Sequence, residues 1–164
     1  MTDTNEMCDP WDIPIEERRK LWIDALKSGK WKPLHGQMGR IDDRRCCLGV
    51  ACEAYLAAGG AIDVTGDHSL IFGGQKYDLP DDVRRWLGLT TESASFPTAD
   101  GTNALVGIND QMFLDATKYG AFAPPTDYAP IVAVLEDPPP GLYQESEAYA
   151  EAGIVEPLDG PAAT

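Results

Sequence analysis

Three cysteines lie close together in the stretch RRCCLGVACEAYLAAGG, which spans residues 44–60. Cysteine thiols can bind metals, form disulfides or act as nucleophiles. If 46–58 is helical, Cys46, Cys47 and Cys52 point at roughly 0°, 100° and 240° around the axis, because each residue turns by about 100°. Cys46 and Cys52 are also separated by about 9 Å of helical rise, so the spacing fits neither a disulfide nor a zinc site. We therefore predict no metal and no cofactor.

A single activated thiolate is the chemical role that remains for these cysteines. Cys46 and Cys47 fall near the expected helix N-terminus, beside Arg44 and Arg45, and such surroundings lower the pKa of a thiol. His35 is the nearest base in the sequence. The competing interpretation is structural, because unpaired cysteine is among the most buried residue types. We favour packing and keep a cysteine-dependent enzyme at Cys46 or Cys47 as the alternative.

The two arginines before the helix suggest a different site. Guanidinium groups together with the free N–H groups of a first helical turn can bind a phosphate, and a nearby tryptophan can stack on a base. The alternative is that Asp42 and Asp43 simply form surface salt bridges with the arginines. The candidate ligand-binding residues are Trp31, Lys32, Arg40, Arg44 and Arg45.

The charge of the chain is strongly negative and unevenly distributed. Its 164 residues hold 13 Lys and Arg against 27 Asp and Glu, a net charge of −14. Residues 1–45 hold as many Lys and Arg as Asp and Glu, so residues 46–164 carry the whole excess of negative charge. Such a surface repels nucleic-acid phosphates, so we expect no direct nucleic-acid binding. One interpretation of the acidity is that it keeps the protein soluble. The other is that it binds a basic partner, and the candidate partner-binding residues are Glu145, Glu147 and Glu151.

The sequence predicts neither a membrane span nor a disulfide framework. No apolar run approaches the roughly 20 residues that cross a bilayer, and the start MTDTNEMCDP lacks the basic and then apolar pattern of a signal peptide. We therefore expect a cytosolic protein in which all four cysteines, including Cys8, stay reduced.

The elements that must position these residues are mostly helices. Pro14 and Gly29 bound a first helix, whose apolar positions lie on one face and leave Arg18, Arg19 and Asp24 to solvent. A polar, glycine-rich stretch over 29–45 suits a short hairpin. The helix expected over 46–58 is apolar nearly all round and should be central. Two further helices are predicted over 79–89 and 126–137, and the stretch 90–126 has little periodicity.

These elements indicate a small, mainly helical α+β protein built around the helix 46–58. We predict a single domain over 1–137, with 1–12 flexible, followed by an acidic tail over 138–164 that begins with prolines.

The order of motifs is similar to that of a family of small uncharacterised proteins encoded mainly by bacteriophages and prophages. The similarity covers about residues 20–137, and its most specific part is Cys46-Cys47-Leu48-Gly49-Val50 together with Cys52. Other matching segments are LWIDALKSGKW, YDLPDDVRRWLGL and ALVGIND. Arg44, Arg45, the stretch 111–126 and the acidic tail are outside the pattern. The resemblance implies a phage origin and no particular chemistry.

Small phage proteins commonly act by binding. The sequence also holds no GxGxxG, P-loop, HExxH or GxSxG motif, which favours binding over catalysis as well. We expect an accessory protein of the host cytoplasm that inhibits a host protein, such as a defence protein, or sequesters a small anionic or nucleotide signal. The alternatives are the cysteine-dependent enzyme and a virion-associated structural protein.

Overall fold

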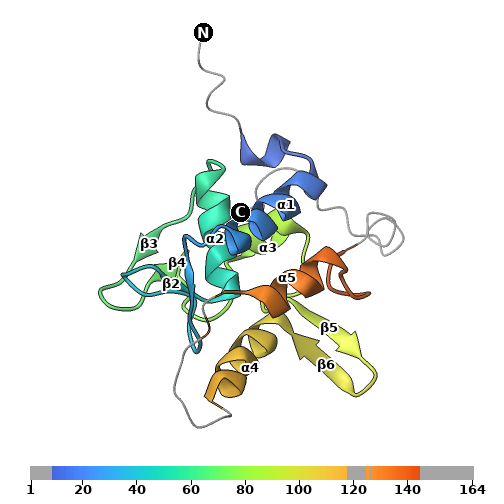
Figure 1. Cartoon of the computed structure of the whole chain (residues 1–164). Coiled ribbons are helices and arrows are strands. Elements are labelled where there is room, and N and C mark those ends of the chain that lie inside the picture. Colours follow the sequence, from blue (N-terminus) through green and yellow to red (C-terminus); the bar gives the residue numbers. More distant parts are fainter. Residues whose placement is uncertain (1–8, 118–124, 126, 145–164) are drawn as a thin grey trace.

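The fold is α+β and mainly helical, as predicted. The computed structural model describes residues 9–117, 125 and 127–144. Within this described part of the chain, five α-helices lie among three two-stranded sheets (Figure 1). In chain order the elements are η2 (Pro10–Asp12, a 3-10 helix), α1 (Ile15–Lys27), β1 (Lys32–Pro33), β2 (Arg44–Arg45), α2 (Cys47–Ala57), β3 (Val64–Thr65), β4 (Ile71–Phe72), α3 (Asp81–Leu87), β5 (Ser95–Thr98), β6 (Gly101–Ala104), α4 (Leu105–Thr117) and α5 (Ala129–Glu136).

Helix α2 is the central element, which confirms the expectation from its apolar sequence. Eight of its residues are buried, and α1, α3 and α4 all contact it. Gly49 explains how closely the preceding loop packs on this helix, since a Cβ at this position would lie 2.0 Å from the Met38 carbonyl oxygen. Only glycine fits there, so packing explains the glycine of the CCLGV segment.

Helices α1 and α3 begin and end within two residues of their predicted bounds. Pro14 and Pro80 are their N-caps, and Gly88 ends α3 in the left-handed conformation with φ +71°. Arg18, however, is fully buried, so the prediction that it faces solvent is wrong. Its guanidinium donates to the carbonyls of Ile13 and Trp86, and a buried cation that satisfies carbonyl groups is tolerated in a core.

The stretch 29–45 does not form the predicted hairpin. Strands β1 and β2 pair in parallel, with Lys32 opposite Arg44 and Pro33 opposite Arg45. The ten residues between the strands turn back before β2, so that Gly39 pairs with Arg45 in the antiparallel sense and Arg40 pairs with Ser69. The loop is therefore tied to the segment before β4, which a local hairpin would not do.

The stretch 90–126 holds more regular structure than its lack of periodicity predicts. Strands β5 and β6 form an antiparallel hairpin that projects from the helical body (Figure 1). Helix α4 follows directly, and its inward face carries the buried polar residue Asn109 beside Leu105 and Met112. A polar residue on the buried face weakens the apolar repeat by which a helix is predicted.

The described chain remains packed beyond α5. Leu142 is fully buried, and the Thr90 N–H donates to its carbonyl at 3.1 Å. Gln144 N–H donates to the Gly88 carbonyl at 2.7 Å. At the other end, within the segment 1–12 that the sequence predicts to be flexible, Pro10–Asp12 form η2 and Trp11 is buried. The remainder of the predicted acidic tail lies outside the described residues.

Among the described residues, no helix combines the length and the apolar character needed to cross a bilayer.

Candidate functional site

The three described cysteines are part of the core. Cys46 is the N-cap of α2, whereas Cys47 and Cys52 lie within the helix, and all three are buried. Burial raises the pKa of the Cys46 thiol to about 11, and it also raises the pKa of Cys47 and Cys52. This is the opposite of the shift that activates a nucleophile, so the geometry supports packing as their role. Cys8 lies outside the described residues.

Arg45 is bound within the protein. Its Nε donates to Glu53 on α2 at 2.9 Å, and its Nη1 donates to the carbonyls of Arg40, Asp42 and Arg44 at 2.7–2.8 Å. Its guanidinium carbon also lies 4.5 Å from the centre of the Trp31 ring. The side chain is 7% exposed. These contacts use the guanidinium internally, which argues against Arg45 as a phosphate ligand.

Neighbouring Arg44 points the other way, because successive side chains of a strand alternate between its two faces. Its guanidinium pairs with the Asp42 carboxylate at 2.9 Å, and both side chains are exposed. This pair holds the pKa of Asp42 below its usual value. The surface salt bridge that the sequence offered as the alternative to an anion site is therefore present, although Asp43 is not its partner.

The structure brings the five predicted ligand residues close together, but it does not arrange them as an anion site. Lys32 lies opposite Arg44 in the β1–β2 pair, and the Arg40 N–H donates to the Arg44 carbonyl at 3.1 Å. Trp31 instead stacks with Arg45. At the start of α2, the Cys47 N–H donates to the buried Asn109 side chain at 3.1 Å, so this donor is not open to a ligand. Glu145, Glu147 and Glu151 lie outside the described residues.

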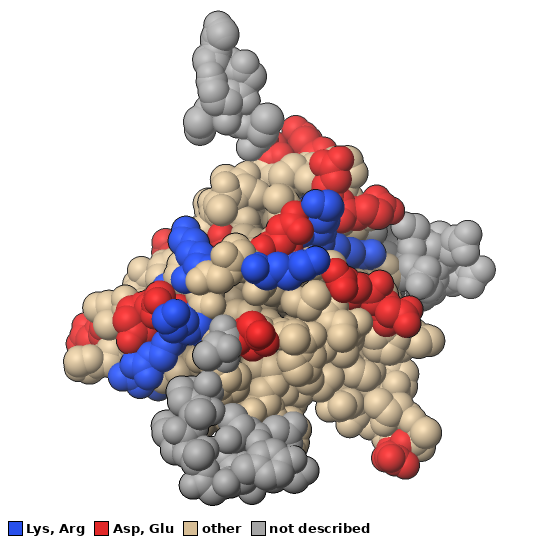
Figure 2. Space-filling model, in the orientation of Figure 1, with Lys and Arg blue, Asp and Glu red and all other residues tan. Residues whose placement is uncertain are grey.

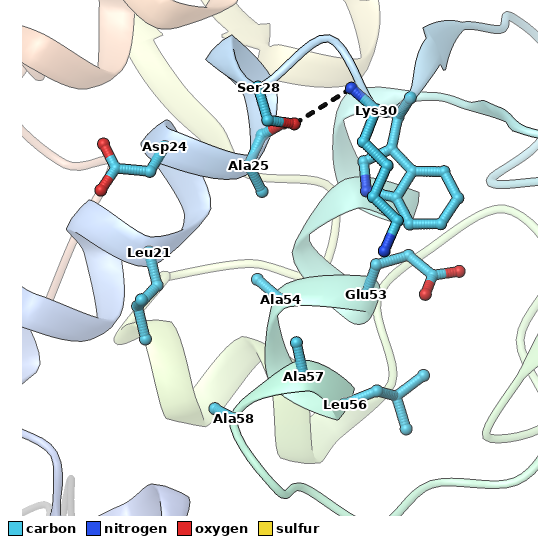
Figure 3. A pocket seen from close by; sticks show the side chains of 11 residues that line it. Leu21, Asp24, Ala25, Ser28, Lys30, Glu53, Ala54, Leu56, Ala57 and Ala58 are labelled. Carbon is cyan, nitrogen blue, oxygen red and sulfur yellow. Dashed lines mark hydrogen bonds between the residues drawn. The ribbon is translucent and has the colours of Figure 1, made fainter.

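An open hollow lies between α1 and α2, and we call it the α1–α2 groove. Leu21 and Ala25 of α1 face the small side chains of Ala54 and Ala57 on α2 and of Ala58, its C-cap (Figure 3). The groove has a volume of about 630 Å³. Leu21 is 40% exposed, which is high for a leucine beside a core helix. The remaining lining residues are Asp24, Ser28, Lys30, Trp31, Glu53 and Leu56.

A second hollow, the α1–α5 groove, lies beside the first. Its volume is about 450 Å³, and Trp31 lines both grooves. Lys27 and Glu136, which form an ion pair at 3.2 Å, line the α1–α5 groove. The other lining residues are Leu26, Gly29, Asp127, Tyr128, Ala129, Val132 and Ala133.

Charges of both signs alternate around these grooves. On the face shown in Figure 2, Lys and Arg atoms lie among Asp and Glu atoms rather than in one basic patch. The ion pairs Lys20–Asp24 and Lys27–Glu136 are part of this pattern. Among the described residues there is no group of three or more His, Cys, Asp or Glu side chains that could hold a metal ion.

Sequence reasoning named Trp31 but missed the grooves. The available signal was the set of Ala54, Ala57 and Ala58, which give α2 one side of small residues, together with Leu21 on the adjacent helix. A helix that is apolar nearly all round is expected to be covered on every side, and only the placement of α1 shows that one strip of α2 stays open.

The chain belongs to the family DUF8296, a domain of unknown function, whose model matches residues 15–137. Searches of the curated proteins and of the solved structures found no match.

Proposed function

We propose that this DUF8296 member is a phage-encoded accessory protein that acts without catalysis, by binding a host protein in the host cytoplasm. A protein of host defence is the kind of target that we would test first. The observation that carries the proposal is the α1–α2 groove, an apolar hollow left open on the helix around which the fold is built. A surface hollow lined by apolar side chains can accept apolar side chains of a partner.

The surroundings of the reactive side chains favour binding over chemistry. Burial keeps the thiols of Cys46, Cys47 and Cys52 protonated at neutral pH. The internal contacts of Arg45 favour a protein partner over a small anionic ligand, because the strongest candidate phosphate donor is already occupied. The CCLGV pattern supports the phage origin.

The proposal can be tested with two matched arginine substitutions in the full-length chain. Ala57 is exposed and lines the α1–α2 groove, whereas Ala99 is exposed in the turn between β5 and β6. An affinity-tagged chain is recovered from infected cells, and its companions are identified by mass spectrometry. We expect a host protein to accompany the wild type and Ala99→Arg, and to be lost with Ala57→Arg. Equal recovery with both variants, or no companion protein at all, would refute the proposal.

A further inference from the structure

We propose that the α1–α2 groove and the α1–α5 groove form one docking surface for an amphipathic helix of the partner whose apolar face is flanked by Lys and Arg. This inference rests on the proposed function and specifies the segment that the partner inserts. It starts from the position of Trp31, whose side chain lines both grooves and so joins them.

Trp31 is held in place before any partner arrives. Arg45 stacks against its ring, and Arg45 is itself fixed by Glu53 and by three backbone carbonyls. Lys30 Nζ lies 5.0 Å from the centre of the same ring. An anchored tryptophan loses little side-chain entropy on binding, and tryptophan is enriched among the residues that dominate interface energies.

The walls of both grooves suit a helix. Ala54, Ala57 and Ala58 line one groove, and Ala129 and Ala133 line the other, so there is room beside these short side chains for larger ones. A helix presents such side chains at positions i, i+3 or i+4, and i+7. The two grooves on either side of Trp31 would then receive successive anchors from one helical face.

The charge of the protein indicates which residues should flank the apolar face of that helix. Four acidic residues and two basic residues line the two grooves. The four acidic residues that line the grooves are Asp24, Glu53, Asp127 and Glu136. Asp24, Glu53 and Glu136 are paired with Lys20, Arg45 and Lys27, so among the described residues Asp127 is the acidic lining residue outside these ion pairs. The whole chain carries a net charge of −14, so its field attracts a basic segment and repels a second copy of the chain. A basic partner is therefore favoured over self-association.

The test is a selection of displayed peptides on the full-length protein. A library of random 16-residue peptides is enriched for binding to the wild-type chain and depleted of peptides that bind Ala57→Arg or Ala133→Arg. Ala133 is exposed and lines the α1–α5 groove, so each groove is blocked by its own variant. Ala99→Arg is the control and should bind the selected peptides as the wild type does.

We expect the selected peptides to share apolar residues at helical spacing with Lys or Arg beside them, and each groove variant to lower their affinity at least tenfold. Peptides that lack this spacing, that carry acidic flanks or that bind both groove variants normally would overturn the inference, as would an unenriched library. A dimer in sedimentation that Ala57→Arg dissolves would overturn it in favour of a second copy. The recovery of a host protein that depends on Ala57 would still support the proposed function in each of these cases.

Discussion

Arg45 Nε donates to the Glu53 carboxylate at 2.9 Å and thereby ties the strand before α2 to the middle of that helix. The two side chains are 7% and 20% exposed, so the pair is largely shielded from water. A shielded pair of this kind is costly to break, because removal of one partner leaves the other charge without compensation.

The first prediction concerns this pair. Arg45→Met should lower the free energy of unfolding by about 3 kcal/mol, since Glu53 and the carbonyls of Arg40 and Asp42 lose their donor. Urea unfolding followed by tryptophan fluorescence measures the change. Arg44→Met is the matched control, and it should change stability far less because its partnership with Asp42 is exposed. Equal effects of the two substitutions would show that Arg45 has no special structural role.

The second prediction concerns Asn109. Its Nδ2 donates to the Leu34 carbonyl at 2.6 Å and its Oδ1 accepts from Cys47 N–H at 3.1 Å. Asn109→Leu keeps the volume but leaves two buried backbone groups unpaired, so stability should fall by about 2 to 4 kcal/mol. The same substitution at Asn103, which is exposed, serves as the control. A loss at Asn109 no larger than that at Asn103 would contradict this assignment.

The third prediction concerns the accessibility of the thiols. In a Cys8→Ser background, the remaining thiols are those of Cys46, Cys47 and Cys52. Because all three are buried, they should resist a thiol-specific chromogenic reagent at pH 8 until denaturant is added. Rapid labelling of one thiol in the folded protein would contradict this prediction and would favour the alternative of a cysteine-dependent enzyme.

The fourth prediction is a loss of stability at high pH. The pKa of Cys46 is about 11 in the folded chain, against an ordinary value of 9.0. Below about pH 9 the thiol is neutral in both states and its contribution is complete, whereas between pH 9 and 11 it ionises more readily in the unfolded chain. The urea midpoint should therefore fall across this range. Cys46→Ala should make the fall less steep, and an unchanged slope would contradict the assigned shift.

Much of the fold follows from local signals in the sequence. Pro14, Pro80 and Gly88 fix the ends of α1 and α3, and the apolar run of α2 identifies the central helix. The parallel pairing of β1 with β2 could not be predicted in this way, because it depends on where the intervening loop meets the segment before β4. Helix α4 escaped prediction because its buried face includes Asn109.

The candidate site was less predictable than the fold. Trp31 was identified, but as a stacking partner for a base. Its position at the junction of two grooves depends on how α1 packs against α2 and α5, which no local pattern contains. The burial of Arg18 has the same cause, since one of the carbonyls that it satisfies belongs to Trp86, 68 residues further along the chain.

Photo-crosslinking from within the α1–α2 groove is the most direct test of the central claim that this groove binds a host protein. A photoreactive phenylalanine derivative is placed at Ala57 of the full-length chain in infected cells, with the same substitution at Ala99 as the control. We predict a crosslink between Ala57 and one defined segment of a host protein, and no crosslink to that protein from Ala99. A crosslink to the same protein from both positions, or none from Ala57, would contradict the claim.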